Sequence, residues 1–331
     1  MIFMEPLISN VPAWDQSITS FLAKNNIDVW AMDYRWALVP PDTKDFKFMK
    51  NWGLQRDVDD AKIALALARL IRGATGQGVG KLHLLGFSYG TMVAYPLTNQ
   101  ETQIPNSLRS VKGLIPVDWA IVYPADSPFH ALSCSLLPQD EARYAAAVYN
   151  DDYSSLKLFG DMGQSTPYDP SPFADGFTNY QFALFVGASV SYQPSWHFVA
   201  GVFDGNGVTT GLQYTKPWLW MDVIRAVPFY IPVQSDIDGD RVGCYDMVAP
   251  FTDHLADITL PILYVGAAGG TGDVGSYAPT LTASTDFTKF TVQLHPEAEP
   301  TLDFGHADLF TATHAQTLVW QPILHWLQVH R

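Results

Sequence analysis

The chain has 331 residues, enough for one large domain or two ordinary ones. Hydrophobic residues make up 47% of the sequence and charged residues 16%, so a sizeable core is expected and extensive disorder is not. The net charge of −14 argues against nucleic acid or an anionic membrane surface as the partner, because both require clustered positive charge. The sequence has no apolar run long enough for a transmembrane helix.

The N-terminus, the composition and the cysteines bear on the cellular compartment of the protein. The chain begins with a short apolar segment that lacks the basic region and longer apolar region of a secretory signal, which slightly favours the cytoplasm. The low lysine content, the acidity and 44 aromatic residues would also suit a secreted enzyme. Cys134 and Cys244 are too few for a disulfide scaffold or a four-cysteine zinc site, and we expect two buried thiols rather than one disulfide. The sequence carries no signal for the oligomeric state.

The first third of the chain alternates between strand and helix patterns. Short apolar runs predict strands, and apolar residues at helical spacing predict helices. The expected strands cover residues 2–4, 27–32, 81–85 and 111–117, and the expected helices cover 15–24, 57–72 and 91–97. Alternation of this kind is typical of βαβ units and a parallel sheet.

The alternation stops after Asp118. Residues 119–255 are rich in Pro, Gly, Ser and aromatic side chains and hold more than half of the aromatic residues, which indicates a cap or lid insertion that packs through large apolar groups. Strand patterns return at 260–265 and 289–294, and a final helix is expected at 314–329. We therefore expect a core formed by residues 1–118 and 256–331, interrupted by a cap of residues 119–255.

The most informative motif is Gly86-Phe87-Ser88-Tyr89-Gly90, which has the pattern G-x-S-x-G. It follows an apolar strand and precedes a helix, the context in which such a serine is a nucleophile. A sharp strand-to-helix turn exposes the serine hydroxyl, and small flanking residues let neighbouring elements approach closely. The helix N-terminus then directs N–H groups and a positive dipole end toward the reacting oxygen.

With this motif, the chain resembles the α/β-hydrolase superfamily over nearly its whole length. Asp33-Tyr34-Arg35 resembles the D-x-R segment of that family, although Trp36 follows where a glycine is common. Phe304-Gly305-His306-Ala307-Asp308 resembles its catalytic-histidine loop. The order serine, acid, histidine along the chain also agrees. The resemblance implies that the first two of the usual eight strands are missing and that the strand at 27–32 becomes an edge of the sheet.

A serine needs an adjacent imidazole to take its proton. His306 is the best candidate for this base, because it lies in a loop between the last strand and the last helix, after a glycine that permits a tight turn. His254 and His295 are weaker alternatives on loops. The histidines of the final helix are expected to be solvent-facing or capping residues.

The acid departs from the family pattern. After the strand ending at Val265 the family normally has G-x-x-D, but this chain has Gly266-Ala267-Ala268-Gly269. Asp273 follows inside a glycine-rich run. The alternative is Asp118, at the end of a strand that resembles the acid-bearing strand of haloalkane dehalogenases, whose aspartate nucleophile Ser88 replaces here. An orienting carboxylate must be held rigidly, so we favour Asp118 and keep Asp273 as the second candidate. Weaker alternatives remain, namely Asp126, Asp286 and Asp303.

An oxyanion hole needs backbone donors. One is expected from the N–H of Tyr89, directly after the nucleophile. The other is expected from the loop after the first strand, where Glu5-Pro6 replaces the common His-Gly. Because proline has no N–H, Leu7 is the candidate for the second donor.

These residues predict a serine hydrolase that cleaves a small hydrophobic carboxylic ester through an acyl-enzyme. Amidase, thioesterase or acyltransferase chemistry would use the same residues, and a catalytically silent protein that binds an apolar ligand is the alternative from another class. No cofactor or metal is expected. The run Asp236-Ile237-Asp238-Gly239-Asp240 only superficially resembles a calcium loop, because Arg241 and Met247 occupy the positions that need Gly and Glu.

Overall fold

The computed structural model describes residues 2–3, 17–191, 195–245, 247–297 and 299–331. A five-stranded parallel sheet of order β1-β2-β3-β8-β9 forms its centre. The strands are β1 (Ile2–Phe3), β2 (Leu82–Phe87), β3 (Val111–Val117), β8 (Ile262–Ala267) and β9 (Phe287–Val292). This is the mostly parallel sheet that the strand and helix alternation predicts.

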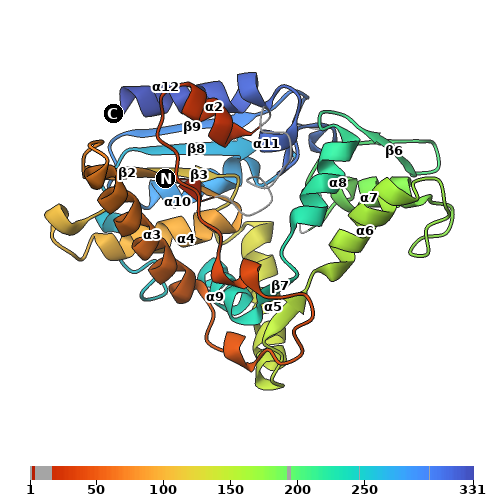
Figure 1. Ribbon diagram of the computed structural model, residues 1–331, viewed down its shortest axis with the longest axis horizontal. Coiled ribbons are helices and arrows are strands. Elements are labelled where there is room, and N and C mark those ends of the chain that lie inside the picture. The colour runs from red at the N-terminus through yellow and green to blue at the C-terminus, as the bar shows by residue number, and fades with distance from the viewer. Residues whose placement is uncertain (1, 4–16, 192–194, 246, 298) are drawn as a thin grey trace.

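Helices cover both faces of the sheet (Figure 1). On one face lie α3 (Leu54–Ala74) and α4 (Tyr89–Glu101), and on the other lie α2 (Ile18–Lys24) and α12 (Gln321–Val329). Side chains of β2 alternate between two cores, with Leu84 packed among the first set of helices and Leu85 among the second. The sheet is therefore buried on both faces, as parallel sheets are.

The segment between β3 and β8 forms two groups of elements. One group contains α5 (Pro128–Ala145), β4 (Asn150–Asp152), β7 (Tyr230–Pro232) and α9 (Val233–Cys244). The other contains α6 (Ser154–Ser165), α7 (Asn179–Ala188), β5 (Gly201–Phe203), β6 (Thr209–Leu212) and α8 (Pro217–Ala226). The first group lies beneath the sheet and the second to its right in Figure 1.

Most expected elements are present with shifted ends. The helix expected at 57–72 extends over α3, and the strand expected at 111–117 coincides with β3. The final helix begins with a π-helical turn, Gln316–Trp320, before α12. The remaining short elements are α10 (Tyr277–Thr280) and α11 (Asp308–Thr311).

The strand expected at 27–32 is wrong. The segment lies outside the named strands, and only Ala31 has an isolated bridge. Its alternation has another origin, because Ile27 and Val29 pack against one core while Trp30 and Met32 pack against the other. Burial on two sides thus produces a strand-like pattern in a segment that belongs to none of the strands of the described residues.

The expectation of two free thiols is also wrong. Cys134 of α5 and Cys244 of α9 form a disulfide, with their Cα atoms 4.7 Å apart. The two helices pack side by side, which brings together cysteines 110 positions apart in the sequence. Disulfides of this kind are typical of proteins from oxidising compartments.

We expect Cys134→Ser with Cys244→Ser to lower the free energy of unfolding by about 2–5 kcal/mol, because the disulfide restricts a long loop of the unfolded chain. Thermal unfolding with and without reductant measures the effect. The reductant should lower the melting temperature of the wild type and leave that of the double variant unchanged. Two reactive thiols in the untreated wild type would contradict the pairing.

Candidate active site

Ser88 occupies a strained turn between β2 and α4. Its backbone has φ 54° and ψ −123°, a conformation that non-glycine residues rarely adopt. The turn requires close approach, since a Cβ atom on Gly86 would lie 2.3 Å from the carbonyl oxygen of Gly90. The Ser88 N–H donates to the carbonyl of Val117 over 3.1 Å, which ties the turn to the end of β3. The strand, turn and helix thus hold the serine as the G-x-S-x-G pattern predicts.

Asp118 directly follows β3 and is fully buried. It too has a positive φ, 48°. Its carboxylate accepts backbone hydrogen bonds from Ala267 (2.8 Å), Thr271 (3.1 Å) and Gly272 (3.2 Å). These donors all come from the end of β8 and the loop after it, so they compensate for the loss of hydration and fix the carboxylate.

The loop after β8 explains the departure from G-x-x-D. It carries no carboxylate at that place, and instead surrounds the carboxylate of Asp118. A Cβ atom on Gly270 would lie 2.0 Å from Asp118 Oδ2, so a side chain there is incompatible with the observed position of Asp118. The glycine-rich run thus acts as a cradle of N–H groups for an acid that comes from the neighbouring strand.

His306 is the partner of Asp118. Its Nδ1 lies 2.7 Å from Asp118 Oδ2, and only 1% of the residue is exposed. Phe87 stacks on the imidazole with 4.4 Å between ring centroids. The other ring nitrogen, Nε2, is buried and has no hydrogen-bond partner within the part of the chain that the structure describes. An unpaired buried nitrogen is costly, and it marks the position where a further group would complete the network.

The segment between α7 and β5 also positions the histidine loop. The N–H of His306 donates to the carbonyl of His197 (2.9 Å), and the N–H of Ala307 donates to that of Phe198 (2.7 Å). Trp196 lies beside the imidazole, with ring centroids 5.1 Å apart. Sequence reasoning missed this segment, because its contribution comes through backbone carbonyls.

Asp308 is a second residue that the sequence did not single out, although it lies in the histidine motif. It is fully buried and accepts from the N–H groups of Ala200 (2.8 Å) and Gly305 (2.9 Å) and from the hydroxyl of Thr215 (2.5 Å). Burial raises its pKa to about 6. The carboxyl thus ties the histidine loop to residues 200 and 215 of the segment between β3 and β8.

Ser88 and His306 line one cavity of about 170 Å³. The rest of the lining is mostly apolar and comes largely from the segment between β3 and β8, including Leu156, Val186, Phe198, Trp220, Val223, Ile224, Val227 and Ile231. Apolar cavities with a few convergent polar groups are typical of ligand sites.

The other candidate acids lie elsewhere. Asp273 bonds to Thr291 (2.5 Å) and Lys289 (3.0 Å) of β9, and its side chain is 66% exposed. The hydrogen bond from Thr291 lowers its pKa. Asp303 accepts backbone N–H groups of its own loop, Asp286 bonds to His330, and Asp126 is exposed. Of these carboxylates, only Asp118 bonds to His306.

Tyr89 is the first residue of α4, so its N–H lies at the positive end of the helix. Its hydroxyl donates to Asp57 over 2.7 Å. Asp57 is almost fully buried, and burial raises its pKa to about 7. The second expected oxyanion donor, Leu7, lies outside the described residues.

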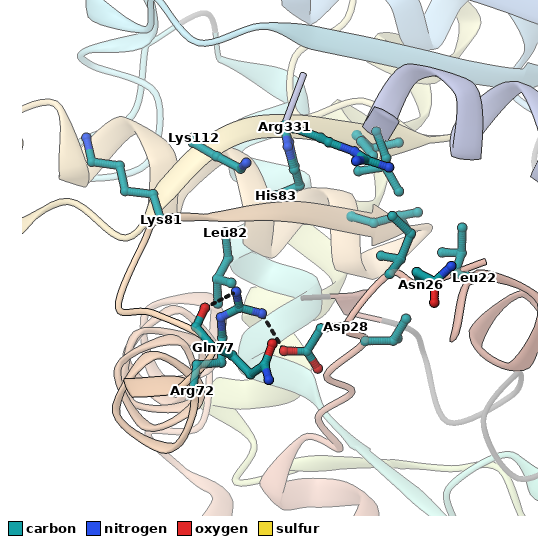
Figure 2. A pocket seen from close by; sticks show the side chains of 15 residues that line it. Leu22, Asn26, Asp28, Arg72, Gln77, Lys81, Leu82, His83, Lys112 and Arg331 are labelled. Atoms are coloured by element: carbon teal, nitrogen blue, oxygen red, sulfur yellow. Dashed lines mark hydrogen bonds and ion pairs between the residues drawn. The ribbon is translucent and has the colours of Figure 1, made fainter. Parts of the chain in front are cut away.

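A cavity of about 400 Å³ lies apart from these residues (Figure 2). It is lined by basic side chains at the edge of the sheet, including Arg72, Lys81, His83, Lys112 and Arg331, and by neither Ser88 nor His306. Arg72 bonds there to Asp28 and to the carbonyl of Gln77. This cavity therefore takes no part in the candidate site.

None of the helices in the described part of the chain is long and apolar enough to cross a bilayer. No group of three or more His, Cys, Asp or Glu side chains in the same ranges is arranged to hold a metal ion. The run 236–240, which superficially resembles a calcium loop, forms part of helix α9.

The chain thus has a parallel sheet with helices on both faces and a serine on the turn after the second strand of that sheet. No protein-family model matches the sequence, and a comparison with curated proteins gives no match. A monoglyceride lipase of Saccharomyces cerevisiae, solved with a substrate analogue, is similar in structure with a TM-score of 0.55 and 12% identity, over 99% of this chain and 85% of that one. The monoacylglycerol lipase of Paleococcus ferrophilus has a TM-score of 0.46 and 13% identity, over 100% of this chain and 94% of that one. This chain has the fold of the α/β-hydrolase superfamily.

We expect Gly270→Ala to displace the Asp118 carboxylate, because the new methyl group would overlap Oδ2. The variant should lose about 1–3 kcal/mol of unfolding free energy, the cost of buried hydrogen bonds left unmade. It should also lose the strongly deshielded proton signal of the His306 Nδ1–H in NMR spectra. Gly205→Ala is the matched control, since nothing lies within 4 Å of a Cβ atom there. An unchanged signal in Gly270→Ala would show that the cradle is not needed.

We expect Asp57→Asn to remove part of the pH dependence of stability. An unfolded aspartate titrates near pH 4, whereas Asp57 titrates at about 7 in the folded protein. Between these values the folded state holds a proton that the unfolded state has lost, so this residue makes stability fall as pH rises. Urea unfolding at pH 4.5 and 7.5 measures the change. Asp59→Asn, on an exposed part of α3, should retain the wild-type slope.

Proposed function

We propose that the protein is a serine hydrolase that cleaves a hydrophobic carboxylic ester. One observation carries the proposal: His306 lines the same cavity as Ser88, its Nδ1 is bonded to Asp118, and its buried Nε2 has no hydrogen-bond partner among the described residues. An imidazole held at one nitrogen and unpaired at the other is suited to take a proton from a nearby hydroxyl.

In this mechanism, the Ser88 oxygen attacks the acyl carbon while His306 Nε2 takes the hydroxyl proton. The imidazolium then returns the proton to the leaving alkoxide, and an acyl-enzyme remains. A water molecule, deprotonated by the same nitrogen, releases the acid and restores Ser88. Asp118 holds the tautomer with a proton on Nδ1 and stabilises the imidazolium, and the loop after β8 keeps Asp118 in place.

Charge develops on the carbonyl oxygen in the transition state. We assign its stabilisation to the backbone N–H of Tyr89 at the start of α4 and to that of Leu7. Both donors belong to the backbone, so the replacement of the usual His-Gly by Glu5-Pro6 does not remove this function.

The lining of the cavity supports a hydrophobic substrate. Aromatic and branched aliphatic side chains surround the serine, and an apolar group gains free energy by leaving water for such a site. Residues 119–255, which supply most of this lining, act as the cap in this proposal. The similar yeast structure is a monoglyceride lipase, which agrees with a lipid-like ester.

The first test is labelling with a fluorophosphonate, which reacts with an activated serine. We expect the wild type to be labelled at Ser88, and both Ser88→Ala and His306→Ala to lose labelling together with ester turnover. His254→Ala is a matched control, because its imidazole bonds to Asp257 away from the cavity. A folded wild type that remains unlabelled would favour a protein that only binds an apolar ligand.

The second test distinguishes the two candidate acids. We expect Asp118→Asn to lower kcat for a short-chain 4-nitrophenyl ester by about 10⁴-fold, the loss seen when the orienting carboxylate of a triad is removed. Asp273→Asn should retain near wild-type turnover, because its carboxylate faces β9 and solvent. The reverse order of the two variants would show that Asp273 is the acid. A panel of esters, amides and thioesters then separates the possible acyl chemistries.

A further inference from the structure

A second cavity at Ser88, which becomes the acid-lined cavity below, has a volume of about 460 Å³. It shares Ser88, Trp119, Tyr153 and Ile231 with the cavity of about 170 Å³ described above, which we call the apolar cavity. The apolar cavity is bounded by the group of elements around α6, α7 and α8, and the second by the group around α5 and α9. The two cavities meet at Ser88, and of the two only the apolar cavity is lined by His306. A substrate whose reacting bond lies at Ser88 would therefore extend into both.

The second cavity is lined by four carboxylates. Asp140 comes from α5, Asp151 from β4, and Asp236 and Asp240 from α9. Among the described residues of the lining, Arg143 is the only permanently cationic side chain, and it bonds to Asp140 (2.8 Å) and to Asp151. The charge of Arg143 is thus shared by two carboxylates and does not balance all four.

Asp236 and Asp240 are the two carboxyl groups of this lining that Arg143 does not contact. Asp236 lies against Asp151 and Asp240 lies against Asp140, and neither forms a salt bridge with a cationic side chain among the described residues. Burial and the neighbouring carboxylates raise the pKa of Asp240 to about 7 and that of Asp236 well above its ordinary value. An added positive charge would favour the ionised form of such partly buried carboxyl groups, because an opposite charge nearby lowers the pKa of a carboxyl.

The rest of the lining also suits an organic cation. Aromatic rings contribute much of the surface: Trp36, Tyr89, Trp119, Tyr123 and Tyr153. Aromatic faces attract ammonium groups in addition to carboxylates. The cavity is also large enough for more than a single ion, and no group of described side chains is arranged to hold a metal.

We propose that the acid-lined cavity binds an ammonium group, so that the preferred substrate is an ester with an apolar part on one side of the scissile bond and a cationic part on the other. This inference rests on the proposed hydrolase function and names its substrate class. Asp236 and Asp240 are the specificity-determining residues, and the aromatic lining packs around the alkyl groups of the cation.

A pair of esters of equal shape tests the proposal. The butanoate esters of 2-(trimethylammonio)ethanol and of 3,3-dimethylbutanol differ at one atom, a charged nitrogen in the first and a neutral carbon in the second. We expect the wild type to prefer the cationic ester by about tenfold or more in kcat/KM, the range expected when a quaternary ammonium meets aromatic faces and nearby carboxylates. Higher ionic strength should reduce the preference only partly, because the carboxylates are mostly buried.

Variants then assign the preference to residues. We expect Asp236→Asn with Asp240→Asn to lower the ratio of kcat/KM for the cationic ester to kcat/KM for the neutral ester to about one. Asp161→Asn is the matched control, because it removes the charge of an exposed aspartate of the same segment, which pairs with Arg225 on the outer surface. Turnover of the neutral ester also shows that each variant is folded.

The outcomes separate this inference from the proposed function. Cleavage of the neutral ester with no preference for the cationic one, or a preference that the double variant keeps, overturns the ammonium site alone. If neither ester is cleaved and Ser88 is not labelled, the hydrolase proposal fails. Calorimetric binding of tetramethylammonium to the wild type and the double variant then decides the ammonium site by itself, since binding lost in the double variant supports it and equal or absent binding overturns it.

Discussion

The hydrogen bond between Asp118 and His306 is the interaction on which the candidate site depends. It spans 2.7 Å in a place from which water is excluded, and it joins the end of β3 to a loop 188 positions later. A buried carboxylate is costly unless its oxygens are satisfied. Three backbone N–H groups from β8 and its loop meet that requirement. The adjacent strands β3 and β8 therefore hold the Asp118 carboxylate together.

The same arrangement explains why glycine is needed at particular places. Gly86 lets the turn at Ser88 approach α4, and Gly270 lets the loop close over the Asp118 carboxylate. Both positions lie at the carboxyl ends of parallel strands, where ligand sites of open α/β sheets occur. Close backbone contact thus replaces side-chain support around the serine and the acid.

The segment between β3 and β8 lines the cavity at Ser88 and also supports the histidine loop. Its His197 and Phe198 carbonyls accept from the histidine loop, and Asp308 bonds back to Ala200 and Thr215. Displacement of that segment would therefore disturb the position of His306. The disulfide between α5 and α9 stiffens the part of the segment that carries the acid-lined cavity.

Local patterns were sufficient to predict the layered α/β fold, the strand before Ser88 and the turn that holds it, because periodicity and a glycine-flanked serine depend on near neighbours in the chain. They failed at 27–32, where burial between two cores imitates a strand, and at Cys134 and Cys244, whose pairing depends on how α5 and α9 pack. The sequence favoured Asp118 over Asp273 on grounds of rigidity, but only the tertiary structure brings one of these carboxylates to His306. Contacts across more than a hundred residues, among them the N–H cradle and the four carboxylates of the second cavity, follow from the packing of distant elements, which no local pattern encodes.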